Sequence, residues 1–492
     1  MVRLVRQGFD VALKKSLSLF DIVLMNLVAV TSFRWIAAAG SNGFPSITLW
    51  ILAVILFFAP QGLAVAELSS RFPGQGGLYR WTRDSLNDRH GFLCGWCYWI
   101  CNLVYFPSLL LFVSANLAFV AQSFGYLADP QQAKNFVVLV TLGNLWLVAL
   151  LNIFGMHVAK WLQNFGALGN YVPAAIIAGL GIVALVLHGS ATPFHFSDLL
   201  PKIHDPKQLT FFSQMCFAFA GLELVSFLGG EIENPKKTIT QGIVIAAFLI
   251  TGVYLIGTLG ILLSVSQEKI TTVNGILLPI REAGKLIHAA WLSTVSGVFI
   301  ALAGVGATMA WFAGAARVPY IVSVDKYLPR WFGDLHPKWQ TPVTAIFVQM
   351  ACATVLTLFA TAGSATQVEA AYQVLVDMCI VLYFIPYCYL FISLFRNRKR
   401  TNAELNNASL YLIPGGTTGV CVVAITGLLV TSLAIVTTII PLGQTIDWGS
   451  FAKTTGGTFL MIALGILIYW RGNYQKKRTT FRTPGLNPAE AF

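Results

Sequence analysis

The sequence FDIVLMNLVAVTSFRWIAAAG, residues 20–40, decides how the rest of the chain is interpreted. It is apolar over a length that crosses a membrane, since a helix rises 1.5 Å per residue and the hydrocarbon core is about 30 Å thick. Its centre nevertheless holds Thr31, Ser32 and Arg34. A charge at mid-membrane costs about 2.5 kcal/mol or more, so it normally faces a cavity or a partner. The stretch therefore predicts a transmembrane helix that is interrupted at mid-depth.

Apolar stretches of similar length recur along the whole chain of 492 residues. Charged residues make up only 11% of it, against about 25% in soluble domains, so lipid must cover much of the surface. We expect an all-α integral membrane protein with about twelve transmembrane helices and no soluble domain. Their predicted positions are 20–40, 47–68, 93–124, 136–155, 160–187, 209–230, 238–264, 291–323, 342–361, 371–395, 411–436 and 456–470.

The net charge of +12 lies in short basic clusters between the apolar stretches. This distribution is typical of membrane topology, and it argues against a nucleic-acid partner, which would need one continuous basic patch. Most of the Lys and Arg residues fall in segments that face the cytoplasm if the N-terminus is inside. We therefore expect a multi-pass protein of the cell membrane with both termini cytoplasmic. The first apolar stretch has no cleavage site, so we expect a retained tail and no removable signal peptide.

The sixth stretch resembles the first in carrying an interruption. In FAFAGLE, residues 217–223, small residues are followed by Glu223, which an ordinary membrane-spanning helix avoids. Open backbone at such a point can bind ions and substrate head groups, and matching interruptions in two halves are typical of an inverted repeat. In the alternative, Gly221 permits close helix packing and Glu223 pairs with a polar neighbour.

The predicted organisation is a five-plus-five inverted repeat with broken helices 1 and 6, followed by helices 11 and 12. Its parts are a cytoplasmic N-terminal tail (1–19), a first repeat of helices 1–5 (20–187), an extracellular loop (188–208), a second repeat of helices 6–10 (209–395), helices 11 and 12 (396–470) and a cytoplasmic C-terminal tail (471–492). Residues 274–288, NGILLPIREAGKLIH, have the spacing of an amphipathic helix at the membrane surface.

Motifs along nearly the whole chain resemble those of the amino acid–polyamine–organocation (APC) superfamily of transporters. They are Ala66, Glu67, Leu68, Pro73, Gly76, Gly77, Tyr79 and Trp81 after helix 2; Phe217 to Glu223 with Gly230, Glu231, Asn234 and Pro235 in and after helix 6; and Ala316, Arg317, Asp325, Leu328, Pro329, Thr341 and Pro342 around the end of helix 8. The resemblance implies alternating access around a site at mid-membrane. It also implies an aromatic gate at Phe217, a gating or proton-linked glutamate at Glu223, and a tryptophan over the substrate at Trp311.

The chain departs from the superfamily pattern at two places. The glycine-rich break of helix 1 is replaced by VTSFRW, residues 30–35, which resembles the glutamate/GABA-antiporter and polyamine-uptake branches more than the other permeases. Asn170 stands near the position where some proton-coupled members have a lysine in helix 5. The second departure weakens a lysine-based coupling mechanism.

Candidate substrate-binding residues gather on four of the predicted helices. They are Val30, Thr31, Ser32, Phe33, Arg34, Asn102, Tyr105, Phe217, Ala218, Phe219, Ala220, Gly221 and Trp311. Arg34 either grips a substrate carboxylate through paired hydrogen bonds or lies in a snorkelled or ion-paired position. Asn102 and Tyr105 either bind the solute or hold helices together.

Three acidic residues are candidates for proton coupling or gating. Glu223 is one because burial favours the neutral form of a carboxyl group. Asp377 is a substrate-ammonium partner, a proton carrier or a structural acid. Glu67, four residues before Arg71, is more consistent with an ion pair or an inner gate than with substrate contact.

The sequence contains no HExxH, GxSxG or GxxxxGK[ST] motif, so we do not expect an enzyme. Cys94, Cys97 and Cys101 share a helix face and are expected to pack rather than bind metal, and no cofactor is predicted.

The leading prediction is a secondary transporter that moves amino acids by exchange or proton symport. Its partners would be a small amino acid or amine, protons as the coupling ion, and the lipid bilayer. Uptake of polyamines or other organic cations is the alternative, and a transporter-like sensor or channel is a weaker one.

Overall fold

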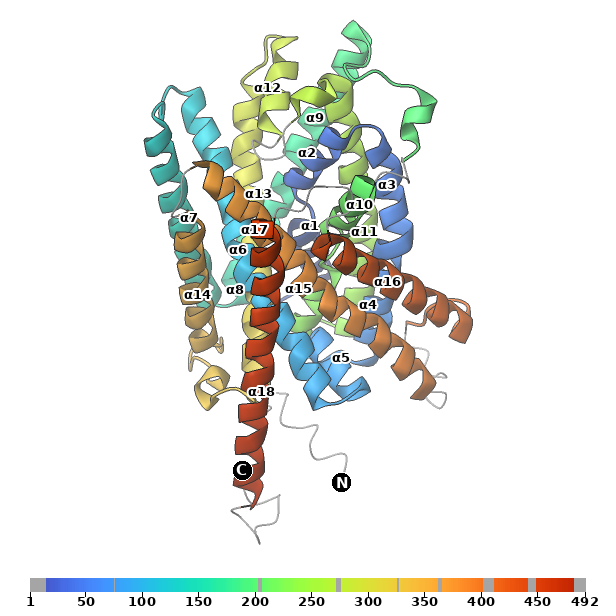
Figure 1. Cartoon of the computed structure of the whole chain (residues 1–492), viewed down its shortest axis with the longest axis vertical. Coiled ribbons are helices and arrows are strands. Elements are labelled where there is room, and N and C mark those ends of the chain that lie inside the picture. The colour runs from blue at the N-terminus through green and yellow to red at the C-terminus, as the bar shows by residue number, and fades with distance from the viewer. Residues whose placement is uncertain are drawn as a thin grey trace.

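A computed structural model describes residues 15–74, 76–201, 206–270, 276–324, 327–361, 365–400, 411–440 and 448–481, and these residues form a bundle of helices (Figure 1). In its first half lie α1 Leu19–Val30, α2 Phe33–Asn42, α3 Pro45–Ala53, α4 Ala59–Arg71, α5 Gly77–Ser85, α6 Asp88–Ser123, α7 Pro130–Ile153, α8 Met156–Gly169 and α9 Tyr171–His188. In its second half lie α10 Pro206–Ala218, α11 Pro235–Ser264, α12 Leu277–Lys285, α13 Leu292–Val324, α14 Val343–Thr361, α15 Ala365–Arg400, α16 Gly416–Ile439, α17 Trp448–Phe451 and α18 Gly457–Phe481. Asp325 of the superfamily motif lies outside the described residues, as do residues 1–14 and 482–492 of the predicted tails.

The all-α membrane fold is confirmed. In the described part of the chain, ten helical stretches are long and apolar enough to cross a membrane, and the bent pair α1–α2 would be an eleventh. The predicted count of about twelve also includes α14, whose apolar part, Val343–Phe359, falls below the length of the others. The amphipathic stretch forms α12, with Leu277 and Ile280 buried and Arg281 exposed.

Helix 1 is broken where the polar residues predict it. Between α1 and α2, Thr31 and Ser32 have extended backbone, and the two helices meet at 45°. We call these two residues the α1–α2 break. Because Thr31 and Ser32 interrupt the helical hydrogen bonds, backbone groups at mid-membrane need partners from other helices.

Helix 6 is broken as well. It ends as α-helix at Ala218 and continues as a 3₁₀ helix, η4 Leu222–Glu231. Phe219, Ala220 and Gly221 form what we call the α10–η4 break. Gly221 has φ +138°, and a Cβ there would lie 3.0 Å from the ring of Trp311, so only glycine fits without strain.

Two other predicted helices are less regular than expected. The second contains a π-helix, Val54–Phe58, between α3 and α4. The fifth, predicted as one helix over 160–187, is divided into α8 and α9 at Asn170. Asn170 is buried between them.

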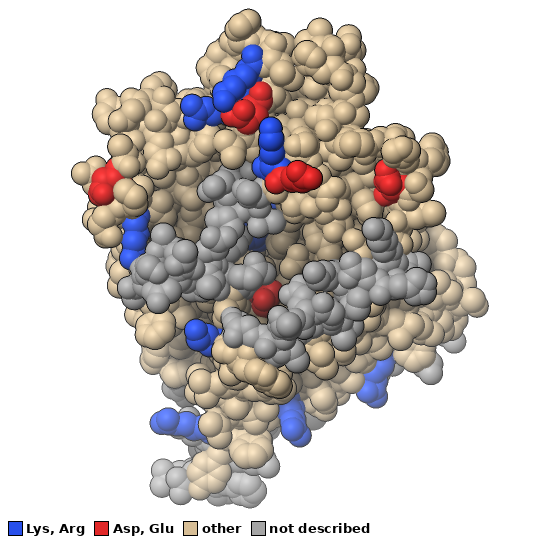
Figure 2. All heavy atoms as spheres, turned by 45° about the horizontal axis from the view of Figure 1, so that its top comes forward, with Lys and Arg blue, Asp and Glu red and all other residues tan. Residues whose placement is uncertain are grey.

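The long helices α6 and α13 form the centre of the bundle. They pack against each other, α6 also packs on α15, and α13 also packs on α8. Helices α7 and α14 lie side by side on one flank, and α18 extends beyond the bundle (Figure 1). In Figure 2, Lys, Arg, Asp and Glu are few and scattered, and uncharged side chains cover most of the visible face. This surface fits a protein surrounded by lipid.

One side of the bundle is closed by main-chain and ionic contacts. The segment before α1 pairs with the end of η4 through a Leu17–Ile232 bridge, with Ser16 N 2.9 Å from Glu231 O and Glu233 N 3.0 Å from Leu17 O. On the same side, the Arg317 side chain of α13 bonds the Glu231 carboxylate at 2.5 and 2.8 Å. One half of each broken helix, α1 and η4, is therefore joined to the other.

Candidate substrate site

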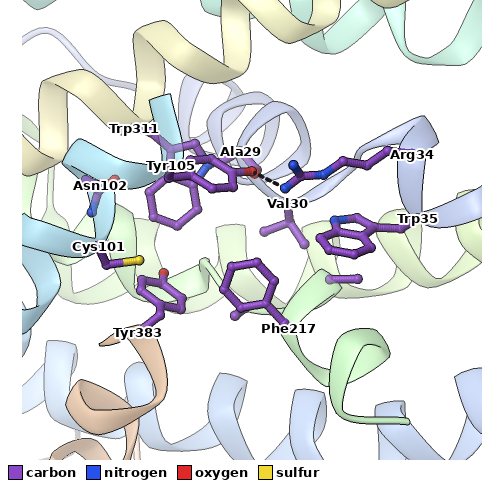
Figure 3. A pocket seen from close by; sticks show the side chains of 12 residues that line it. Ala29, Val30, Arg34, Trp35, Cys101, Asn102, Tyr105, Phe217, Trp311 and Tyr383 are labelled. Carbon is purple, nitrogen blue, oxygen red and sulfur yellow. Dashed lines mark hydrogen bonds between the residues drawn. The ribbon is translucent and has the colours of Figure 1, made fainter. Parts of the chain in front are cut away.

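A small pocket lies between the two helix breaks, at the side of α6, α13 and α15 (Figure 3). About 350 Å³ of space not filled by atoms lies at the pocket, a volume that includes open solvent beside it. Its lining consists of Ala29, Val30, Arg34, Trp35, Cys101, Asn102, Tyr105, Phe217, Ala218, Ala220, Trp311 and Tyr383. The pocket thus lies where the two predicted interruptions face each other.

Arg34 carries the only charge among these lining residues. Arg34 is 4% exposed, and its Nη2 donates to the Tyr105 hydroxyl at 3.1 Å. The guanidinium carbon lies 4.4 Å from the ring centre of Trp35 and 5.1 Å from that of Tyr105. Figure 3 shows the side chain crossing above the pocket toward Tyr105. The site is therefore positively charged and walled by aromatic rings.

Aromatic side chains from five helices enclose the pocket. The Phe217 ring makes edge contacts with Trp35 and Tyr383, each at 5.8 Å between ring centres. The Trp311 ring contacts Tyr105 at 5.8 Å and Tyr383 at 5.7 Å. Trp311 is held in place because its Nε1 donates to the Ala29 carbonyl at 2.8 Å. The positions that the resemblance implies for Phe217 and Trp311 thus lie in one aromatic cluster.

Tyr254 of α11 connects the two helix breaks. Its hydroxyl lies 2.6 Å from the Val30 carbonyl and 3.1 Å from the Ala218 carbonyl, which are the last residues of α1 and α10. The same oxygen accepts a hydrogen bond from Ser32 N at 3.2 Å. Its ring is stacked on Trp50 at 4.5 Å. One hydroxyl therefore lies against backbone groups of both helix ends: it accepts one N–H and has one proton to share between the two carbonyls.

Glu223 lies next to the pocket and does not line it. It is fully buried, and its carboxylate bonds the hydroxyls of Tyr383 and Tyr387 from α15. Tyr383 lines the pocket, whereas Tyr387 accepts a hydrogen bond from Gly221 N at 2.9 Å. The two tyrosines therefore connect the carboxyl group to the pocket on one side and to the α10–η4 break on the other.

The other predicted acids lie elsewhere. The Glu67 carboxylate is paired with Arg71 and Arg398, both at 3.0 Å, and accepts from Ile413 N at 2.9 Å. This is the ion pair that the spacing predicts, and it lies outside the pocket lining. Asp377 of α15 is partly buried and also outside the lining.

Eight of the thirteen predicted substrate-binding residues line the pocket. The remaining five belong to the breaks or pack behind them: Thr31, Ser32, Phe33, Phe219 and Gly221. Phe219 packs on Phe58, Trp50 and Tyr254 instead. The sequence reasoning did not select Ala29, Trp35, Cys101 or Tyr383. Ala29 and Trp35 could have been predicted from the sequence, because they flank the interruption of helix 1.

The described residues contain no group of three or more His, Cys, Asp or Glu side chains that would hold a metal ion. Cys94 and Cys97 are buried in α6, and the Cys101 thiol lies 3.4 Å from the Cys379 carbonyl across the α6–α15 contact. The cysteines thus pack between helices.

A multi-pass membrane protein with two broken helices around a small buried pocket belongs to the class of small-solute transporters. A family model for amino acid permeases matches residues 17–478. The chain belongs to this amino acid permease family of the APC superfamily, and it is a transporter rather than an enzyme.

Three relatives illustrate the range of the family. An uncharacterised transporter of Legionella pneumophila is 28% identical over 88% of this chain and 91% of its own length. A probable agmatine/putrescine antiporter of Lactococcus lactis is 26% identical over 65% of this chain and 66% of its own. A glutamate/gamma-aminobutyrate antiporter of the same species is 22% identical over 92% of this chain and 88% of its own length.

Proposed function

We propose that this permease transports an amino acid across the cell membrane by alternating access, through exchange or proton symport, and that Arg34 binds the substrate carboxylate. The observation that carries the proposal is the buried guanidinium of Arg34 in the lining of a pocket between the two helix breaks. A guanidinium in the wall of a pocket can hold a carboxylate through two parallel hydrogen bonds. A cationic substrate would bring a second positive charge instead.

In this proposal each pocket element has a role. Arg34 orients the carboxylate, and Asn102 Oδ1 is available to the amino group. Phe217 and Trp311 enclose the side chain. Glu223 is the proposed proton site, because it is buried beside the pocket and bonded to a lining residue, Tyr383.

Glu67 and Asp377 have different proposed roles. The position of Glu67 between two arginines supports a part in the inner gate rather than in substrate binding. Asp377 lies on α15, two residues from Cys379 and its contact with α6. We propose a gating role for Asp377 at this contact between α15 and α6.

The repeat boundaries 20–187 and 209–395 and the cytoplasmic location of both termini are part of the proposal. The breaks fall in the first helix of each half, and the third helices, α6 and α13, pack together. Residues 16 and 17 contact η4, whose Glu231 binds Arg317 of α13, and Gly472 of α18 packs on Tyr327 just after α13. These contacts support one common side for both ends, and the basic clusters identify it as the cytoplasm.

Uptake of an organic cation is the second candidate. Five aromatic rings line the pocket, and aromatic faces attract cations. One relative is named as a probable agmatine/putrescine antiporter. This candidate predicts that Arg34 weakens substrate binding instead of strengthening it.

Binding to the purified protein distinguishes the two candidates. Amino acids would be compared with the amines that result from removing their carboxyl group, using the unaltered protein and Arg34→Gln. We expect Arg34→Gln to weaken amino acid binding about tenfold or more, since hydrogen bonds to charged groups contribute about 1.5–3 kcal/mol. Arg281→Gln, at an exposed arginine of α12, is the matched control. Tighter amine binding by Arg34→Gln would favour the second candidate, and unchanged amino acid binding would remove Arg34 from the site.

A further inference from the structure

Gln61 of α4 is buried directly against the α10–η4 break. Its side chain is fully buried, and with Oε1 facing the break it lies 3.1 Å from Leu222 N and 3.3 Å from Gly221 N. In the same orientation Nε2 lies 3.3 Å from the Phe219 carbonyl. One amide from another helix thus replaces both a donor and an acceptor that the break removes from helix 6.

The π-helix explains why a glutamine of α4 reaches this point. Val54–Phe58 lies directly before α4, and Gln61 follows in its first turn. One inserted residue turns the following helix by about 100° relative to an uninterrupted α-helix. The neighbouring Phe57 and Phe58 rings contact Tyr387 and Phe219 at 5.5 and 4.5 Å. The irregular turn therefore aims this face of α4 at the break.

The hydroxyl of Tyr387 connects Gln61 to Glu223. It lies 2.9 Å from the Gln61 amide and accepts from Gly221 N at 2.9 Å, and it is also bonded to the Glu223 carboxylate. A phenol has one proton to donate. It can donate to Gln61 or to Glu223, but not fully to both.

The protonation state of Glu223 decides between these two patterns. An ionised Glu223 can only accept hydrogen bonds, so the Tyr387 hydroxyl donates its hydrogen bond to Glu223. Gln61 Oε1 then faces the phenol oxygen with no hydrogen between the two atoms. If the amide turns over instead, Nε2 donates to Tyr387 but then faces the N–H groups of the break. Protonated Glu223 can donate to Tyr387, which then donates to Gln61, and every group in the network is satisfied.

We propose that Gln61 is a positioning residue that responds to the protonation of Glu223 through Tyr387 and thereby sets the conformation of the α10–η4 break. The inference rests on the proposed role of Glu223 as the proton site. Because Phe217, Ala218 and Ala220 line the pocket next to this break, a change at Gln61 reaches the substrate.

The titratable and charged groups around Glu223 belong either to this hydrogen-bond network or to other ion pairs. The titratable side chains that act on it are Tyr383 and Tyr387 of α15 and Tyr98, Cys94 and Cys101 of α6. On the other elements packed against η4, Arg317 of α13 binds Glu231, Glu67 of α4 binds two arginines, and Asp21 of α1 binds Lys160. In α5, Arg80 and Arg83 pair with Asp84, and the charged residues of α11 are Lys236 and Lys237 in its first turn.

Thermal unfolding of the purified protein tests the proposal without a substrate. The variants are Gln61→Met, which keeps the volume but cannot form these hydrogen bonds, Glu223→Gln, and the double variant, each measured from about pH 5 to about pH 9. The matched control is Gln349→Met. Gln349 is also fully buried and also bridges helices, through Trp99 Nε1 at 3.0 Å and the Phe312 carbonyl at 3.3 Å.

We expect Gln61→Met to lower Tm by about 2 °C more at acidic than at alkaline pH, because only the protonated network is complete. In the Glu223→Gln background its effect should stay at the acidic value, since the new amide donates to Tyr387 at every pH. Gln349→Met should lower Tm equally at all pH values. An effect of Gln61→Met that is the same across the pH range, or that still varies with pH beside Glu223→Gln, would overturn the proposal.

Exchange in proteoliposomes provides a second readout. We expect the KM of the unaltered protein to vary with pH and that of Gln61→Met to vary no more than that of Glu223→Gln. A purely structural Gln61 would raise KM by the same factor at every pH. Failure of amino acids to bind would overturn the proposed function and not the Gln61 network, because the unfolding experiment tests the network without any substrate.

Discussion

Removing the hydroxyl of Tyr254 should loosen both helix breaks at once. In Tyr254→Phe the ring keeps its stacking on Trp50 and its contact with Phe219, so the change is confined to one oxygen. That oxygen has three backbone partners, the carbonyls of Val30 and Ala218 and the N–H of Ser32. The partners lie at mid-membrane, where no lipid group can replace the hydroxyl.

The expected loss is about 1–2 kcal/mol. The hydroxyl has one proton for the two carbonyls and accepts one N–H, so two hydrogen bonds are lost, and hydrogen bonds between membrane helices contribute about 0.6 kcal/mol each on average. This range overlaps the cost of about 1–3 kcal/mol for a buried backbone group left without a partner. The loss corresponds to about a 5- to 30-fold shift between ordered and loosened breaks.

Thermal unfolding and substrate binding measure the two consequences. We expect Tyr254→Phe to lower Tm by about 1–2 °C and to weaken substrate binding, because Val30 and Ala218 line the pocket. Thr258→Val is the matched control, since it removes a partner of Trp50 Nε1 at 3.1 Å on the same helix without touching either break. If Tyr254→Phe reduced Tm no more than this control and left substrate affinity unchanged, the reasoning would be refuted.

Two further substitutions test other parts of the structure. Gly221→Ala should abolish substrate binding, because the new Cβ would lie 3.0 Å from both Trp311 and Val30. Gly252→Ala is the control, since a Cβ there meets nothing within 4 Å, and it should bind substrate like the unaltered protein in the same assay. Arg317→Leu should destabilise the protein by about 3–5 kcal/mol in thermal unfolding, since it leaves the Glu231 carboxylate buried and unpaired. Replacing both partners with leucine should restore much of the loss, and equal destabilisation by the single and double variants would contradict this view.

Much of the site was predictable because its residues break a rule of membrane helices. Thr31, Ser32 and Arg34 interrupt an apolar stretch, and FAFAGLE combines small residues with a buried acid, so both breaks follow from composition and spacing. Glu67 and Arg71 were predictable as a pair because they lie four residues apart on one helix.

The remaining parts depend on tertiary contacts that local sequence does not specify. Tyr383 lies in a stretch rich in aromatic residues, and only the packing of α15 on α6 selects it for the pocket. Gln61 reaches the α10–η4 break because of a π-helix, which hydropathy averages over. The division of helix 5 had a local signal, since Gly169, Asn170 and Pro173 lie close together there.

The bridge between Leu17 and Ile232 joins the start of α1 to the end of η4 through main-chain atoms. Its hydrogen bonds are nearly independent of which side chains occupy these positions. An alanine scan would therefore leave this connection intact, and related chains can keep it while their residues diverge. Any movement that opens this side of the bundle must either break the bridge or carry α1 and η4 together as one body.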